Sequence, residues 1–341
     1  MLYSDLSTLE ARGRLAEFIS QIAEQSIVVE RSAPLAGGAS RDMWLVDLVR
    51  GDARERLVLR RDLPTEMVSS ALSREHEFRL MQKAHDAGIR VARPRWLCAD
   101  PQVLGTPFFL MDYVQGIAIG RKIVSAPELA HARAVLPEQM AAALAKIHSL
   151  SVDGLEFLPR PAADVSPVQD AIAQTYATVD ALGVKNPTFE FALRWAERFA
   201  PAPNPIAVIH GDFRIGNLIV DPEGLAAVAD WEFAHLGDPD EELGYLCMRD
   251  WRFGGPGRAG GIADRETFLH AYQSASGRVV DRRSVDFWEF LGNVRWGVIC
   301  LSQAERHLSG LDVSVEFASL GRRSAEMQME ALRLIRTMEA G

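Results

Sequence analysis

The chain of 341 residues is 48% hydrophobic and 24% charged, which is typical of a globular protein and long enough for two domains. Its formal net charge of -9 argues against an extended surface for phosphate backbones, so nucleic acid is not an expected partner. The three cysteines lie far apart without CxxC spacing, which argues against a disulfide framework or zinc knuckle and favours a reducing cytoplasm. Early acidic residues and the lack of about eighteen consecutive apolar residues lead us to expect neither secretion nor membrane insertion.

The first third of the chain is predicted to be rich in strands. Residues 8–24 are expected to form an amphipathic helix, because Ser7 and Glu10 have capping-box spacing and apolar residues then recur at helical intervals. Short apolar runs between turn-forming segments predict antiparallel strands in IVVE, MWLVDL and RLVLRR. A helix in SREHEFRLMQKAHDAG and two more strands in RPRWLCAD and TPFFLMDYV follow.

After Gly116 the pattern becomes helical. The apolar spacing predicts helices in PELAHARAVLPEQMAAALAKIHSL, VQDAIAQTYATVDAL and FEFALRWAERFA, and three more from about residue 266 onward. The predicted class is therefore α+β. We expect a small antiparallel-sheet lobe over residues 1–114 and a larger, mostly helical lobe over residues 115–341.

An island of strands interrupts the helical lobe at IHGDFRIGNLIVDPEGLAAVADWE, residues 209–232. LIV and LAAVA flank a Pro- and Gly-containing turn, which predicts a hairpin that returns Asn217 and Asp230 to the same end, close to Asp212. Each of these residues alone would more often cap a turn or end a strand. Two carboxylates and an amide oxygen gathered together would instead suit Mg²⁺ held jointly with phosphate.

The order HGDxxxxN, hairpin, Asp-Trp resembles the catalytic segment of the aminoglycoside phosphotransferase family, within the protein-kinase-like superfamily, and the resemblance covers nearly the whole chain. HGDFRIGNLIV and WEFAHLGDP resemble in particular the kinase-like domains joined to acyl-CoA dehydrogenases. The resemblance implies a two-lobed kinase-like fold in which Asp212 orients or deprotonates the acceptor hydroxyl and Asn217 and Asp230 hold Mg²⁺. His210 is expected to support the loop, and Asp238 to brace it or cap a helix.

The same resemblance assigns the nucleotide site to the lobe of residues 1–114. Backbone N–H groups at Gly38 and Ser40 would approach phosphates, although a glycine pair in a hairpin is more often only a turn. Arg60 takes the place of the lysine that steadies the α and β phosphates. Glu75 is favoured as its acidic partner, with Glu77 as the competitor.

The segment TPFFLMDYVQG resembles the strand that links the two lobes of a kinase. By that resemblance, the main-chain atoms of Asp112 and Val114 would pair with the adenine base. The side chains of Phe109 and Met111 would then belong to the core or to the wall of the adenine site.

The predicted function is transfer of the γ-phosphoryl group of ATP, with Mg²⁺, to a hydroxyl of a small molecule. A protein kinase is less favoured, because only HLGDPDEELGYL follows the Asp-Trp pair before the next helical region. The alternative is a catalytically silent nucleotide-binding or scaffold protein, because Arg60 departs from the usual lysine.

The candidate acceptors are an amino sugar, choline, homoserine, a hydroxyacyl compound and another alcohol, and no sequence feature selects one of them or indicates the oligomeric state. Arg249, Arg252 and Arg258 would suit an anionic acceptor, or would simply be solvated.

Overall fold

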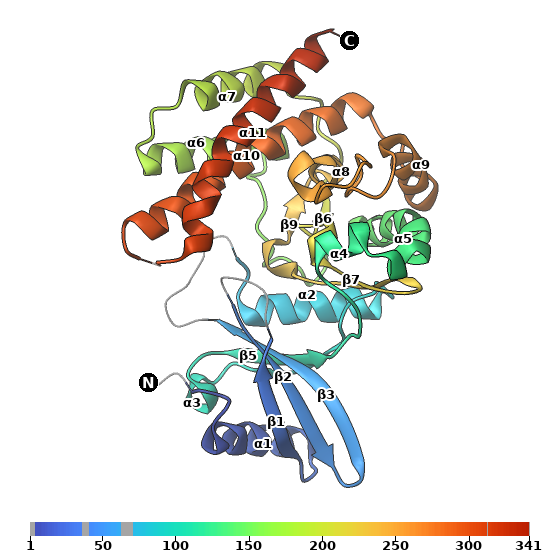
Figure 1. Ribbon diagram of the computed structural model, residues 1–341, viewed down its shortest axis with the longest axis vertical. Coiled ribbons are helices and arrows are strands. Elements are labelled where there is room, and N and C mark those ends of the chain that lie inside the picture. Colours follow the sequence, from blue (N-terminus) through green and yellow to red (C-terminus); the bar gives the residue numbers. More distant parts are fainter. Residues whose placement is uncertain (1–3, 36–40, 63–70, 312, 341) are drawn as a thin grey trace. The chain divides into compact units, whose positions relative to one another are not determined.

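The computed structural model describes residues 4–35, 41–62, 71–311 and 313–340. It divides into two compact units, one of residues 1–116 and 226–234 and one of residues 117–225 and 235–341. The first unit is mainly sheet and the second mainly helix (Figure 1), which confirms the α+β class. Residues 226–234 belong to the sheet unit, whereas the predicted division placed them in the helical lobe.

The first unit is built on a five-stranded antiparallel sheet with the strand order β1-β2-β3-β5-β4. β2 and β3 pair along their full length, so a two-residue turn at Gly51 and Asp52 joins them. The strands are β1 (Val28–Pro34), β2 (Arg41–Arg50), β3 (Ala53–Asp62), β4 (Pro94–Cys98) and β5 (Phe108–Asp112). The helices of this unit are α1 (Leu9–Ala23), α2 (Arg74–Asp86) and α3 (Pro101–Leu104).

Strand alternation sends side chains to both faces of this sheet. Phe108 on β5 points to α1, where its ring centroid lies 5.4 Å from that of Phe18. Phe109, the next residue, points to α2 and contacts Phe78 at 5.9 Å between centroids. Arg60 pairs with Phe109 across β3 and β5 and so shares the α2 face.

The predicted N-terminal cap of α1 was off by one residue. Thr8, not Ser7, is the N-cap, and its side chain accepts a hydrogen bond from the backbone N–H of Ala11. Glu10 forms an ion pair with Arg14 one turn later, in place of the reciprocal bond of a capping box.

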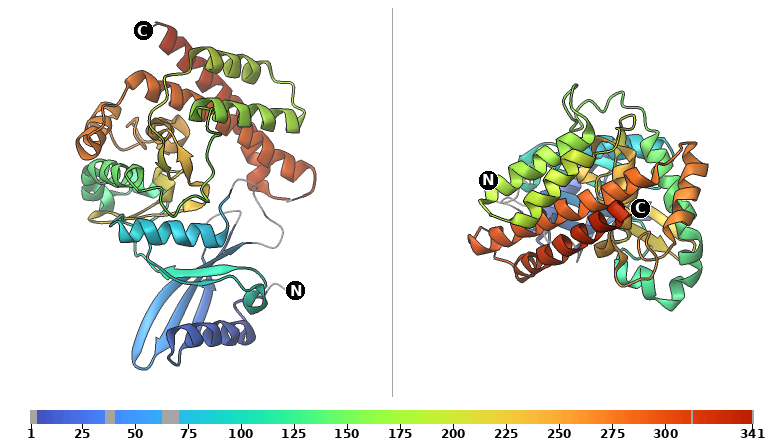
Figure 2. Two further views of the ribbon diagram at one scale, coloured as in Figure 1. Left: turned by 180° about the vertical axis from the view of Figure 1, so that it is seen from behind. Right: turned by 90° about the horizontal axis from the view of Figure 1, so that it is seen from above.

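The second unit is predominantly helical. Its large core lies where α6 (Pro167–Leu182) and α7 (Pro187–Phe199) pack against α10 (Arg282–Leu308) and α11 (Val315–Ala340). The helices α10 and α11 run side by side in both Figure 1 and Figure 2. None of the described helices is both long and apolar enough to cross a membrane. The helices are α4 (Gly120–Ser125), η1 (Pro127–Leu129), α5 (Ala130–His148), α6 (Pro167–Leu182), α7 (Pro187–Phe199), η2 (Ile215–Asn217), α8 (Pro239–Cys247), η4 (Arg249–Arg252), α9 (Arg265–Ser276), α10 (Arg282–Leu308) and α11 (Val315–Ala340).

Short strands surround the predicted catalytic segment. β6 (Ala207–Ile209) pairs with β9 (His235–Gly237), a small sheet that the sequence did not predict. β7 (Leu218–Asp221) and β8 (Gly224–Val228) form the predicted hairpin, and η3 (Trp231–Phe233) follows it. In the turn, the N–H of Glu223 donates to Asp221 Oδ1 at 2.8 Å, and Gly224 adopts a φ of 115° that favours glycine.

Candidate active site

A buried carboxylate holds the backbone of the loop that follows β6. Glu242 of α8 accepts hydrogen bonds from the N–H groups of His210 and Gly211, each at 3.0 Å. Gly211 has a φ of 84°, so its left-handed backbone requires a glycine at this bend. Glu242 Oε2 also lies 3.0 Å from His148 Nε2. Burial raises the pKa of Glu242, but its contacts with His148 and His210 outweigh burial and lower the pKa overall.

The side chain of Asp212 is fixed at both oxygens. Its Oδ1 accepts hydrogen bonds from Tyr245 Oη at 2.7 Å and Arg214 Nε at 3.0 Å. Its Oδ2 accepts a bond from Asn217 Nδ2 at 2.5 Å, and the same nitrogen donates to the Asp212 carbonyl at 3.0 Å. The structure thus brings together two of the predicted residues, Asp212 and Asn217. It adds Arg214 and Tyr245, which the sequence did not single out.

The neighbouring polar residues support the loop. His210 is fully buried, its Nδ1 accepts the N–H of Asp212 at 3.2 Å, and its ring meets Phe213 edge to face. Asp238 is the N-cap of α8 and accepts the N–H of Asp240 at 2.9 Å, together with two bonds from Asn204. Burial raises the pKa of Asp238. Both residues therefore have the structural roles predicted for them.

In the first unit, Arg60 joins two carboxylates. It is 4% exposed, and its Nε lies 3.0 Å from Glu77 Oε2 while its Nη2 lies 3.0 Å from Asp230 Oδ1. Burial lowers the pKa of Arg60, but the charges of Glu77 and Asp230 outweigh burial and raise it above the usual value. Asp230 has a φ of 71°, an uncommon backbone conformation for a residue with a Cβ. Its position is therefore set by the local fold and by Arg60.

The predicted partner of Arg60 was wrong. Glu77, not Glu75, forms the ion pair, and Glu75 instead pairs with Arg79 on the exposed side of α2. Helix geometry explains the difference, because the buried positions of α2 recur every three or four residues and include Glu77 but not Glu75. The regular spacing of Glu77 with the apolar positions Leu80, Met81 and Ala84 could have decided between the two from the sequence.

Of the remaining predicted nucleotide contacts, Asp112 and Val114 lie among the described residues. The N–H of Asp112 donates to the Arg93 carbonyl at 2.9 Å, so only its carbonyl would serve as an adenine contact. Its side chain pairs with Arg95 at 3.0 Å. Val114 follows the end of β5, which is where the resemblance places the adenine contact. Gly38 and Ser40 lie outside the described residues.

The chemistry around Asp230 suits a cation. Two guanidinium groups face four carboxylates there, which gives a formal charge of -2 when all six are ionised. The six residues are Arg60, Arg74, Asp62, Glu77, Asp230 and Glu232. Residues 4–35, 41–62, 71–311 and 313–340 contain no group of three acidic, His or Cys side chains arranged to hold a metal. Mg²⁺ that is bound largely through substrate phosphates needs only one or two protein oxygens, so these residues fit it.

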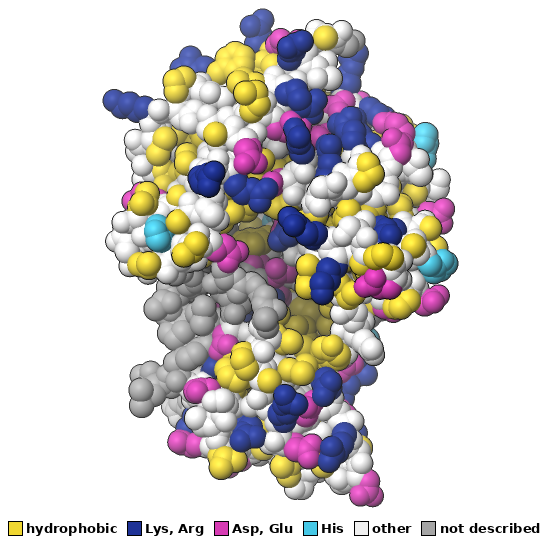
Figure 3. Space-filling model, in the orientation of Figure 1, with side chains coloured by type: hydrophobic (Ala, Val, Ile, Leu, Met, Phe, Trp, Pro, Cys, Tyr) yellow, Lys and Arg dark blue, Asp and Glu magenta, His cyan; other side chains and the backbone are white. Residues whose placement is uncertain are grey.

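The arginines considered for an anionic acceptor have structural partners. Figure 3 shows Lys and Arg side chains gathered on one face of the helical unit. Arg252 and Arg258 both form ion pairs with Glu289, which is fully buried on α10, at 3.1 and 2.6 Å. Burial raises the pKa of Glu289, and the two arginines oppose that effect. They therefore compensate a buried charge, and Arg249, which is exposed, is the member of the three most open to solvent.

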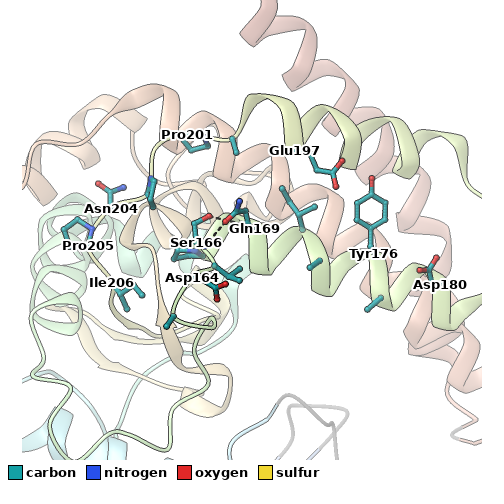
Figure 4. A pocket seen from close by; sticks show the side chains of 18 residues that line it. Asp164, Ser166, Gln169, Tyr176, Asp180, Glu197, Pro201, Asn204, Pro205 and Ile206 are labelled. Atoms are coloured by element: carbon teal, nitrogen blue, oxygen red, sulfur yellow. Dashed lines mark hydrogen bonds between the residues drawn. The ribbon is translucent and has the colours of Figure 1, made fainter.

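A groove of about 1270 Å³ lies in the helical unit, along α6 and the segment of residues 197–206 (Figure 4). None of the predicted site residues lines it. At its centre Ser166 and Gln169 bond to each other in the capping box that begins α6. The polar groups of Ser166 and Gln169 thus serve the start of the helix.

Comparison with known protein families identifies the family of this chain. Residues 32–288 match the model of the phosphotransferase enzyme family (APH). The chain belongs to this family. The match includes Arg60, Glu77, the loop of Asp212 and Asn217, and the hairpin that leads to Asp230, so the predicted relationship to the family is confirmed.

The relatives of this phosphotransferase include parts of larger proteins. It is 34% identical to mouse acyl-CoA dehydrogenase family member 10 over 208 residues, which cover 58% of this chain and 18% of that protein. It is 28% identical over 323 residues to the Arabidopsis thaliana protein named probable acyl-CoA dehydrogenase IBR3, covering 87% of this chain and 38% of that one. The chain therefore spans well under half the length of either relative.

Solved structures show the same fold. A Ralstonia eutropha protein assigned to the aminoglycoside phosphotransferases superposes with a TM-score of 0.74 at 21% identity, covering 95% of this chain and 98% of that one. Spectinomycin phosphotransferase, solved with ADP and spectinomycin, gives a TM-score of 0.62 at 11% identity over 94% and 98% of the two chains. At these identities the likeness establishes the kinase-like fold and leaves the acceptor open.

Proposed function

We propose that this phosphotransferase transfers the γ-phosphoryl group of ATP, bound with Mg²⁺, to a hydroxyl group of a small molecule. The observation that carries the proposal is the buried loop in which Asp212 and Asn217 are held together by direct hydrogen bonds. A carboxylate placed in this way can accept the proton of the acceptor hydroxyl. The acceptor oxygen then bonds to the γ-phosphorus, and the bond from that phosphorus to the bridging oxygen of ADP breaks.

The other residues of the proposed site would bind either the metal ion or the nucleotide. When bound, Mg²⁺ supplies positive charge that offsets the charge of the transferred phosphoryl group and of ADP. Asn217 would contribute its amide oxygen, since its nitrogen donates to Asp212. Asp230 would contribute a carboxylate oxygen, and Arg60 would hold that carboxylate in place while adding positive charge near the phosphates. Charge and position, rather than covalent chemistry by the protein, would lower the barrier.

Support for a nucleotide comes from proteins of the same fold. Spectinomycin phosphotransferase was solved with ADP and LicA with AMP, whereas aminoglycoside 2'-phosphotransferase-IIIa was solved with GDP. We propose ATP for this chain, with the adenine contacted by the carbonyl of Asp112 and the N–H of Val114. Gly38 and Ser40 would supply N–H groups to the phosphates.

The order in which we propose to test acceptors comes from the related proteins, because no sequence motif identifies the acceptor. Because the matching relatives are acyl-CoA dehydrogenase family proteins, a hydroxyacyl compound is the first acceptor that we propose to test. Choline and aminoglycosides follow, because the kinase-like fold is shared with a choline kinase and a spectinomycin phosphotransferase.

The test compares the wild-type chain with Asp212→Asn in turnover and in binding. With γ-labelled ATP, Mg²⁺ and a panel of these acceptors, we expect acceptor-dependent transfer that falls roughly 10²–10⁴-fold in the variant, the range for losing general acid–base assistance. Calorimetric titration should give a similar MgATP affinity for both forms. Asp86→Asn, at a side chain that is 72% exposed, is the matched control and should change neither quantity.

Two results would reject the proposal. Near-normal transfer by Asp212→Asn would remove the assigned role of this carboxylate. MgATP binding by the wild-type chain without acceptor-stimulated transfer across the whole panel would favour the catalytically silent, nucleotide-binding alternative.

A further inference from the structure

We propose that Tyr245 is a positioning residue that orients the carboxylate of Asp212 for phosphoryl transfer, an inference that rests on the proposed function. Tyr245 Oη donates to Asp212 Oδ1 at 2.7 Å, and Arg214 Nε donates to the same oxygen at 3.0 Å. Two donors on one oxygen fix the rotation of the carboxylate about its Cβ–Cγ bond as well as its position. A hydroxyl donor on a charged acceptor also forms one of the stronger types of hydrogen bond.

The helix that carries Tyr245 is held firmly. Asp238 caps its first turn, and Glu242 binds the backbone of the loop just before Asp212. Gly244 lies so close to α10 that a Cβ there would be 2.5 Å from the backbone nitrogen of Glu289. Since Glu242 and Tyr245 are three residues apart, both project from one side of α8 toward the loop. One helix therefore sets both the backbone of the loop and the side chain of Asp212.

An aromatic neighbour restrains the two donors. The ring of Tyr245 lies 5.4 Å from that of Trp251, and the guanidinium of Arg214 lies 4.9 Å from the centre of the same indole. Burial raises the pKa of Tyr245 well above its usual value, and the charge of Asp212 raises it further. Tyr245 is thus a neutral hydroxyl donor throughout the working pH range.

The bonding pattern also indicates where the acceptor hydroxyl binds. An ionised carboxylate offers about four lone-pair positions, two on each oxygen. The described part of the chain supplies two donors to Oδ1, from Arg214 and Tyr245, and one to Oδ2, from Asn217. The second position on Oδ2 is therefore the one at which we place the acceptor hydroxyl. Tyr245 keeps that position facing the acceptor by occupying Oδ1.

The first experiment removes only the hydroxyl group. For Tyr245→Phe we expect kcat to fall roughly 10- to 100-fold, the effect of losing one hydrogen bond to a charged group, while the dissociation constant of MgATP changes less than about twofold. A residue that only supported the fold would lower nucleotide binding and thermal stability together with kcat. Tyr176→Phe, which removes the same group from the groove on α6, is the control and should leave kcat unchanged.

The second experiment asks whether Tyr245 acts through Asp212. In long single-turnover assays with γ-labelled ATP, Tyr245→Phe should cause no further loss when Asp212 is already alanine, because the carboxylate that it positions is gone. A further loss of about the same factor in that background would overturn the inference.

The two proposals fail in different ways. Normal kcat for Tyr245→Phe, with a large loss for Asp212→Asn, would overturn the positioning role and leave the phosphotransferase function intact. A wild-type chain without transfer to any acceptor would remove the proposed function, and the inference with it.

Discussion

Glu241 offers a test of how firmly α8 is anchored, because its ionisation is linked to folding. Its side chain is 13% exposed, and its oxygens lie 2.5 Å from Arg295 Nη1 and 3.3 Å from His235 Nε2. Burial raises the pKa of Glu241, but Arg295 and His235 outweigh burial and lower it from 4.5 to about 2. The carboxylate thus favours the folded state whenever it is ionised there.

The size and the pH range of this effect follow from the shift. A lowering from 4.5 to about 2 corresponds to roughly 3 kcal/mol of folding free energy at pH 7, at about 1.4 kcal/mol per pKa unit. Because the folded pKa is below the unfolded one, this contribution is complete above pH 4.5 and is lost as the pH falls toward 2. At pH 3 about 2 kcal/mol of it should be gone.

Urea unfolding of the wild-type chain and Glu241→Gln between pH 7 and pH 3 measures the contribution. The variant should be less stable by about 3 kcal/mol at pH 7, and the gap should narrow to about 1 kcal/mol at pH 3. Glu190→Gln removes a half-exposed carboxylate from a pair with Arg194 and should cost less than about 1 kcal/mol at every pH. A gap for Glu241→Gln that stays constant with pH would refute the reasoning.

Two further pairs of variants test the packing behind the candidate site. Glu77→Gln removes a carboxylate that is 1% exposed from two buried arginines and should destabilise the fold by roughly 3–5 kcal/mol, whereas Glu75→Gln on the exposed side should stay within about 0.5 kcal/mol. Equal urea midpoints for these two variants would contradict the assignment of Glu77. Gly244→Ala places a Cβ 2.5 Å from the backbone of Glu289 and should cost roughly 1–3 kcal/mol, while Gly13→Ala meets nothing within 4 Å and should stabilise α1 by up to about 1 kcal/mol. Thermal unfolding that gives both alanines the same effect would show that α8 can move away from α10.

Local patterns in the sequence were sufficient for most elements of the fold and for part of the site. Short apolar runs between turn-forming segments predicted the antiparallel strands of the five-stranded sheet, and the Pro-Glu-Gly turn predicted the hairpin of β7 and β8. Asp212 and Asn217 were predicted to lie close together because only four residues of one loop separate them, and the structure joins them through Asn217 Nδ2. Spacing along the chain and distance in space are closely related over such a short segment.

The more distant residues that hold the loop of Asp212 could not be predicted in the same way. Glu242 and Tyr245 lie about thirty residues further along, in a helix of nine residues that is too short and too acidic to show an apolar period. Their contacts with the loop depend on how α8 packs against α10, which is a long-range property. Glu77 differs from these residues, because the helical period of α2 could have identified it from the sequence as the buried partner of Arg60.

In each compact unit, the residues of the proposed active site are held by contacts within that unit. In the helical unit, Asp212 is bonded to Asn217, Arg214 and Tyr245, all of which belong to that unit. In the sheet unit, Asp230 is bonded to Arg60, which Glu77 holds in turn. Because these side chains already have charged or hydrogen-bonding partners, they need no ligand to reach a defined orientation. Catalysis by position and charge depends on such preorganised groups, since little reorganisation energy is then spent when the substrates bind.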